Sequence, residues 1–226
     1  MLRIAAFLFA CCLLVTAGAG AAQNLTGTWS GMLDFSGQPL LFVIAISHTD
    51  KGLSATASSP YQGGDAIPVD SIASSGAKLT FAIPKLDVTY TGTIGGDSIS
   101  GTFTQRGQVV PLKLVPSSLG TSTLDGTWLG TLSTGGDDLL LALHVQSASG
   151  NKLSATMDSP YQKGFGIPVS SIANSNGTLT FAMASINASY TGTIGPQTIA
   201  GTFTQNGKTF PLTFARPAVT APAAAP

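Results

Sequence analysis

The chain has 226 residues, of which 9% are charged, with ten basic and ten acidic side chains. This balance excludes the strongly basic surface that attracts nucleic acid, and it gives no field toward an anionic membrane. Abundant glycine, together with many Thr, Ser, Val and Ile residues, favours short strands and tight turns over helices. We therefore expect an all-β protein that binds no nucleic acid.

Residues 1–22 have the pattern of a cleaved signal peptide. Arg3 provides the positive start, the apolar run Ile4–Val15 follows, and Ala19-Gly20-Ala21 offers a cleavage site. The apolar run is too short to span a bilayer comfortably. We expect a periplasmic or secreted protein whose mature chain starts near residue 22 or 23 and has no transmembrane segment.

Both cysteines, Cys11 and Cys12, lie inside this segment. The mature protein is therefore expected to have no disulfide, no thiolate chemistry and no cysteine metal ligand. An alternative is a lipoprotein attached through Cys11. The bulky Phe9 and the apolar run that continues past the cysteine argue against it.

The rest of the chain is a tandem duplication. Residues 53–115 align with 153–215 without a gap, and more than half of these positions are identical. Upstream, GTWSGML (27–33) aligns with GTWLGTL (126–132), one residue out of that register. A repeat this long indicates duplicated domains rather than a solenoid. We expect domains at 24–116 and 124–216, a linker at 117–123 and a disordered Pro/Ala-rich tail at 217–226.

In the first copy, strands are expected near residues 27–35, 40–47, 53–58, 66–72, 78–84, 87–94, 98–105 and 109–115. Alternation is clearest in the second strand, where one face is apolar in both copies: Leu40, Phe42, Ile44 and Ile46 in the first. The opposite face tolerates polar residues, since Ala45 becomes His144. The first face should therefore point into the core.

Short hairpin turns connect the later strands. Asn206-Gly207 predicts a type I′ turn, and Arg106-Gly107 keeps the glycine in the first copy. Sequential hairpins give an up-and-down meander, which removes exposed edges by closing on itself. We expect two tandem small antiparallel β-barrels or barrel-like rolls, similar to lipocalins in topology, with interiors filled by side chains.

The most conspicuous repeated segment is SPYQGGDAIPV (59–69), which returns as SPYQKGFGIPV (159–169). Pro60 removes a ladder donor and biases Ser59 toward an extended conformation. Pro68 restricts the next strand to an edge or an irregular position. The segment therefore predicts a corner, at which the chain leaves the sheet and returns.

No catalytic constellation is recognisable. Ser98 lies in a GDSI sequence, but the second copy replaces it with PQTI, and no base is placed to activate the serine. His48, expected in a loop, and His144 do not occupy equivalent positions, so neither indicates a repeated metal site. We expect a protein that is not an enzyme and has no metal or cofactor.

Doubled aromatic and amide side chains are the candidate ligand-binding residues: Tyr61, Gln62, Tyr90, Tyr161, Gln162 and Tyr190. Facing a barrel interior, such groups could bind a small apolar or sugar-like molecule. The alternative is that they pack across strands. Trp29 and Trp128 form a further pair, which we expect to close the floor of each barrel rather than bind a ligand.

The joint pattern GTWxGxL, LSATxxSPxQxGxxIPV, LTF, YTGTIG and IxGTFTQxGxxxPL occurs in both copies. It resembles the β-rich module found N-terminal to the catalytic domain of many secreted bacterial α/β-hydrolases and related serine hydrolases. Tyr61 and Tyr161 stand where Asp is typical of that module. In such proteins the catalytic residues belong to the hydrolase domain, which we do not expect in this chain, so the resemblance transfers no catalytic residue.

Three functions follow as hypotheses. The first is an exported, non-catalytic protein that binds a small ligand or a protein partner through its barrels. The second is an accessory module for a separately encoded hydrolase. The third, a hydrolase in its own right, is disfavoured because no nucleophile, base and acid can be assembled. An interior cavity would favour the first hypothesis, and an apolar outer patch shared by both copies would favour the second.

Overall fold

The computed structural model describes residues 24–63, 65–117, 124–148 and 152–219. The expected signal peptide, residues 118–123 of the expected linker and the tail beyond residue 219 lie outside the described residues. Within these ranges, no helix has both the length and the apolar composition needed to cross a membrane.

Each copy of the repeat forms one antiparallel sheet of nine strands. The first contains β1 (Gly27–Asp34), β2 (Pro39–Thr49), β3 (Gly52–Ser58), β4 (Ile67–Pro68), β5 (Ser71–Ser75), β6 (Lys78–Ile83), β7 (Val88–Gly95), β8 (Ser98–Gln105) and β9 (Gln108–Pro116). The second contains β10 (Gly126–Ser133), β11 (Asp138–Ala148), β12 (Lys152–Ser159), β13 (Gly164–Pro168), β14 (Ser171–Ser175), β15 (Thr178–Met183), β16 (Ala188–Ile194), β17 (Thr198–Gln205) and β18 (Lys208–Ala215). Single turns of 3₁₀-helix interrupt them: η1 (Pro60–Gln62), η2 (Pro84–Leu86), η3 (Pro160–Gln162) and η4 (Ala184–Ile186).

The strand order in the first sheet is β4-β3-β2-β1-β9-β8-β7-β6-β5, and the second repeats it. The sheet curls so that its two ends approach each other, and the segment after β4 bonds to a strand near each end. Val69 N–H donates to Ala55 O on β3 (2.9 Å), and Asp70 N–H donates to Ala82 O on β6 (3.1 Å). The expected all-β, up-and-down, barrel-like fold is confirmed.

The expected strand at 66–72 differs from the structure. It is divided into β4, which ends at Pro68, and β5, which begins at Ser71. The reason is that residues 69 and 70 cross from one edge of the sheet to the other. The corner predicted for SPYQ is present: β3 ends at Ser58, and η1 follows with Pro60 at its first position.

The interior of each barrel is occupied by buried side chains. Phe42, Ile44 and Ile46 point inward, as the alternation in β2 predicts. Trp29 and Trp128 are buried in the two cores, and their indole N–H groups donate to Leu25 O and Leu124 O (2.9 and 2.8 Å). The described interiors are therefore packed cores, as expected from their small size.

A glycine makes room for a fully buried tyrosine in each barrel. Tyr90 and Tyr190 are almost fully buried, and each folds back over the glycine two residues later in its strand. A methyl group on Gly92 would collide with the Tyr90 hydroxyl. That hydroxyl donates to the carbonyl oxygens of Ile99 or Leu112, at 3.1 and 3.2 Å. The repeated Tyr-x-Gly pattern is thus a packing device.

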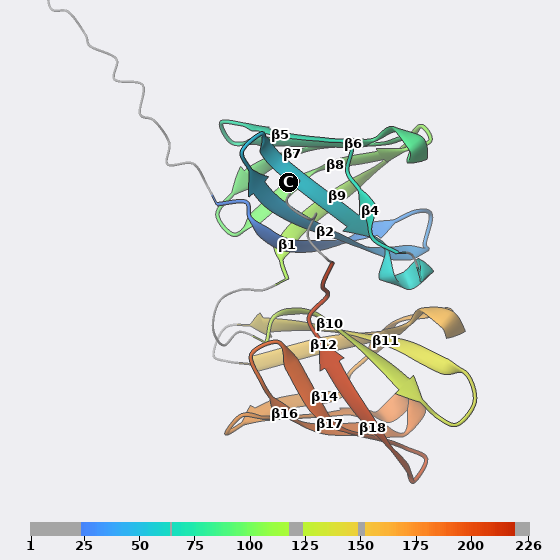
Figure 1. Cartoon of the computed structure of the whole chain (residues 1–226). Helices are drawn as coiled ribbons and strands as arrows, with labels where there is room; N and C mark the ends of the chain where they lie inside the picture. The colour runs from blue at the N-terminus through green and yellow to red at the C-terminus, as the bar shows by residue number, and fades with distance from the viewer. Residues whose placement is uncertain (1–23, 64, 118–123, 149–151, 220–226) are drawn as a thin grey trace, which may run out of the picture.

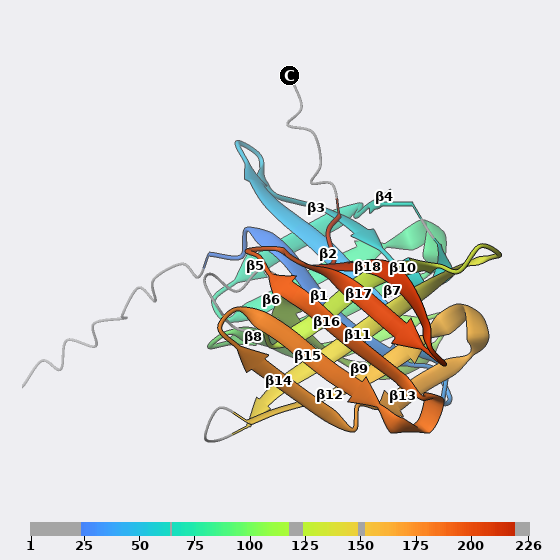
Figure 2. The same ribbon diagram turned by 90° about the horizontal axis from the view of Figure 1, so that it is seen from below.

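The two barrels lie one above the other, in contact through equivalent strands (Figures 1 and 2). The outer faces of β2 and β11, together with Tyr61 of η1, form a buried apolar group, which we call the interface cluster: Leu41, Val43, Tyr61 and Ala142. Contact between equivalent surfaces is the arrangement of an isologous interface. The face of β2 that the sequence indicated as tolerant of polar residues is therefore buried between the barrels.

The first residues of the expected tail reach this contact. Pro217 is buried, and Val219 packs against the interface cluster. Figure 1 shows this stretch leaving the second barrel toward the first. These residues therefore differ from the expectation of a tail with nothing to pack against.

Candidate functional site

One side chain from the first barrel reaches into a polar group on the second. The extended Ser59 and the 3₁₀ turn that starts at Pro60 place Tyr61 on the outside of the first barrel. Its ring lies 6.3 Å from that of Phe165 on β13, and its hydroxyl donates to Asp158 Oδ2 at 2.7 Å. The corner that ends β3 is thus part of the contact between the barrels.

Asp158 and His144 come from neighbouring strands of the second barrel. Asp158 on β12 lies opposite Ala142 on β11, so His144 is its diagonal neighbour on the same face. His144 Nε2 is 2.9 Å from Asp158 Oδ2 and 3.1 Å from the Tyr61 hydroxyl. On the other side of the ring, Nδ1 is 3.0 Å from Thr127 Oγ1. We call Tyr61, His144 and Asp158 the polar triad.

The carboxyl group of Asp158 is charged although it is only 4% exposed. Burial by itself would raise its pKa. Hydrogen bonds from His144, Tyr61 and the Gly166 N–H (to Oδ1, 2.7 Å) outweigh burial and hold the pKa below its ordinary value. Each carboxylate oxygen therefore has a donor, which is what a buried charge requires.

The same contacts keep Tyr61 protonated. Burial, and then the adjacent Asp158 carboxylate, raise the pKa of the Tyr61 hydroxyl far above its ordinary value. A phenol in this state donates a hydrogen bond and cannot serve as a base or a nucleophile at neutral pH. Within the triad, Tyr61 therefore acts as a hydrogen-bond donor to Asp158.

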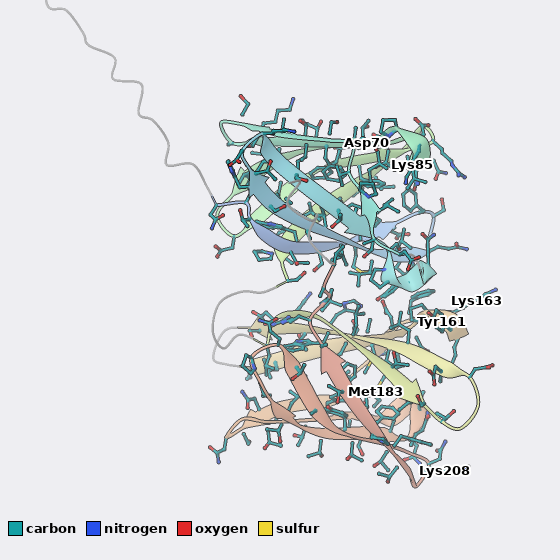
Figure 3. The ribbon with its side chains drawn as sticks, in the orientation of Figure 1. Asp70, Lys85, Tyr161, Lys163, Met183 and Lys208 are labelled. Carbon is teal, nitrogen blue, oxygen red and sulfur yellow. The ribbon has the colours of Figure 1, made fainter. Side chains whose placement is uncertain are left out.

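The triad occurs once although the chain repeats its parts. Tyr161 is the counterpart of Tyr61, but Ala45 and Ser58 stand in the first barrel where the second has His144 and Asp158. Tyr161 is 56% exposed, whereas Tyr61 is 8% exposed. Figure 3 shows Tyr161 and Lys163 on the side of the second barrel that faces the first. Only one of the two tyrosines has an acidic partner, so the contact is asymmetric.

Beside the triad, the barrels enclose a groove with a volume of about 970 Å³. β1 and β9 of the first barrel form one wall, with Met32, Lys113 and Val115. The other wall belongs to the second barrel and carries His144, Asp158 and Phe165, among others. The groove thus combines apolar surface with convergent polar groups, as small-molecule sites do.

The structure places the six candidate residues in three different settings. Tyr61 belongs to the polar triad, whereas Tyr90 and Tyr190 lie in the barrel cores with their hydroxyls bonded to backbone carbonyls. Tyr161, Gln62 and Gln162 are exposed, and Gln162 accepts a hydrogen bond from Ser159 Oγ (2.9 Å). The candidate site therefore retains Tyr61 and does not include Tyr90 or Tyr190.

Sequence reasoning missed His144, Asp158 and Phe165. The available signal was the set of positions at which the second copy departs from the first: Ala45 to His144, Ser58 to Asp158 and Asp65 to Phe165. His144 is partly buried in the triad. His48, expected in a loop, lies near the end of β2 and is exposed. Among the described residues, no group of three or more His, Cys, Asp or Glu side chains could hold a metal ion.

Comparisons with known proteins do not assign the chain to a family. No family model matches the chain, and no curated protein matches it. Among solved structures, it is similar to a protein of unknown function from the DUF3598 family of Nostoc punctiforme. The identity is 12%, the match covers 85% of this chain and 96% of that one, and the TM-score is 0.26.

Proposed function

We propose that this is an exported, non-catalytic binding protein that takes a small molecule in the groove between its barrels. The observation that carries the proposal is the groove itself, which both barrels build and which has His144 and Asp158 in one wall. Its volume is within the range of known small-molecule sites, roughly 300–1,000 Å³. The packed barrel interiors support a site between the barrels rather than inside one.

The lining favours a ligand with a polar part and an apolar part. Met32, Val115 and Phe165 offer apolar contact, and Phe165 adds an aromatic face. Thr127 and Gln146 offer hydroxyl and amide groups. A small, largely apolar or sugar-like molecule with hydroxyl groups suits this combination.

The accessory hypothesis has less support. An apolar outer patch common to both barrels would favour docking on a separately encoded hydrolase. Such a patch exists on β2 and β11, but it is buried in the interface cluster. A protein partner would have to displace the other barrel to reach it. We therefore place small-molecule binding first.

Native mass spectrometry of the exported protein, purified gently, tests the proposal. We expect an added mass that disappears on denaturation. Gln146→Trp should remove it, because Gln146 is exposed and lines the groove. Ser47→Trp is the matched control, because Ser47 occupies the equivalent position on β2 and does not line the groove. A bare mass for the wild type, or an added mass that Gln146→Trp leaves in place, would contradict the proposal.

A further inference from the structure

The wall of the groove that carries His144, Asp158 and Phe165 also contacts Tyr61 of the other barrel. Tyr61 is not among the residues that line the groove. Its hydroxyl nevertheless contacts Asp158 and His144, and its ring faces that of Phe165. Three groups of the wall therefore depend on one residue that the ligand does not reach.

These contacts are directional, unlike the apolar contact beside them. The interface cluster would accept small rotations of one barrel on the other, because apolar packing has no preferred donor direction. A hydrogen bond of 2.7 Å to a buried carboxylate resists such rotations, because its strength falls steeply as its angle departs from linear. The hydrogen bond from Tyr61 to Asp158 is thus a directional contact between the barrels.

The second copy provides an internal comparison. Tyr161 ends the equivalent strand in the same corner motif, but it is largely exposed and has Ala45 and Ser58 in place of a histidine and an aspartate at the equivalent positions. The corner motif therefore does not by itself require a buried tyrosine. Tyr61 is buried where the second barrel presents His144, Asp158 and Phe165, three residues that differ between the copies.

We infer that Tyr61 is the positioning residue of the groove. By binding Asp158 across the contact, it fixes the orientation of the two barrels and holds His144, Asp158 and Phe165 where a ligand meets them. The part of this inference that concerns the ligand rests on the proposed function. The part that concerns the orientation of the barrels does not.

The test compares two single variants, Tyr61→Phe and Tyr161→Phe, because each change removes one hydroxyl and keeps the ring. The exposed Lys85 and Lys208, one on each barrel, are replaced with cysteines that carry spin labels (Figure 3). The labels report the distance between the barrels in the full chain as it is exported. The mass of the labelled protein verifies that it carries two labels. We expect Tyr61→Phe to broaden the distance distribution, and Tyr161→Phe to leave it as in the wild type. Asp158→Ser, which introduces the residue of the first copy, should act as Tyr61→Phe does.

The same variants are then compared by native mass spectrometry. If a bound mass is present, it should be lost from Tyr61→Phe and retained by Tyr161→Phe. An unchanged distance distribution in both Tyr61→Phe and Asp158→Ser would overturn the positioning role. The distance distribution could also broaden in these variants while the wild-type protein carries no added mass. That result would support the role of Tyr61 in orienting the barrels and would contradict only the proposed function.

Discussion

The Tyr61 hydroxyl of the first barrel donates a 2.7 Å hydrogen bond to Asp158 Oδ2 of the second, 97 residues away in sequence. The bond joins a side chain that both copies possess to one that a single copy possesses. A duplicated chain would otherwise present the same surface twice. Here, substitutions on β11 and β12 have made the two halves of the contact different, and the groove lies beside those substitutions.

The stability of the protein should fall in acid because of Asp158. Its pKa is lowered in the folded state, so its stabilising contribution is present above the unfolded carboxyl pKa of about 3.9 and is lost as the pH falls through the lower folded pKa. Urea unfolding of the wild type and of Asp158→Ser should therefore converge as the pH is lowered from 6 toward 2. His144 and Tyr61 are the titratable groups that face the carboxylate. A constant difference over this range would show that Asp158 is not held charged.

Replacing either tryptophan with alanine should destabilise its own barrel by about 3–5 kcal/mol. Both rings are buried, and Trp128 also lies 3.8 Å beneath the guanidinium of Arg216. Thermal unfolding of Trp29→Ala and Trp128→Ala measures the loss. An unchanged melting curve for either variant would mean that the ring does not fill the core.

Gly92→Ala should destabilise the first barrel by about 1–3 kcal/mol, as overpacking of a filled core does. The added methyl group would meet the Tyr90 hydroxyl. Gly95→Ala on the same strand is the control, because no atom lies within 4 Å of a methyl group there. Chemical unfolding compares the two variants, and equal stabilities would refute the role assigned to Gly92.

The two core tyrosines, like Tyr61, should ionise late in an ultraviolet titration. Burial raises the pKa of Tyr90 and of Tyr190 to about 12, compared with an ordinary value of about 10. Tyr90→Phe and Tyr190→Phe should therefore leave the absorbance change below pH 11 as in the wild type. A smaller change in that range for either variant would place its hydroxyl in contact with solvent.

The fold could be predicted from the sequence because the signals that define it are local. The apolar alternation of β2 and the Asn206-Gly207 turn, in which both residues have a positive φ (50° and 78°), each depend on a few adjacent residues. Pro68 places β4 at the edge of the sheet order for the same kind of reason. The division of one expected strand into β4 and β5 was missed, because it depends on where the barrel closes.

The candidate site could be predicted only in part, because it depends on the contact between the barrels. The repeat drew attention to what the copies share, and therefore to Tyr61, Tyr90 and Tyr190 alike. Two of these are core residues, as their positions before Gly92 and Gly192 explain. His144 and Asp158 each look ordinary alone, and nothing in the sequence states that Tyr61 of the other copy contacts both of them.

A nuclear Overhauser experiment between the Tyr61 and His144 rings in the wild-type protein shows whether the polar triad joins the two barrels. The hydroxyl of Tyr61 is 3.1 Å from His144 Nε2, so we expect cross-peaks between their ring protons, and we expect Asp158→Ser to remove them. Cross-peaks within a barrel, such as those between the stacked rings of Phe81 and Tyr90, serve as the reference. If these appear and the Tyr61–His144 cross-peaks do not, the barrels are not joined by the polar triad.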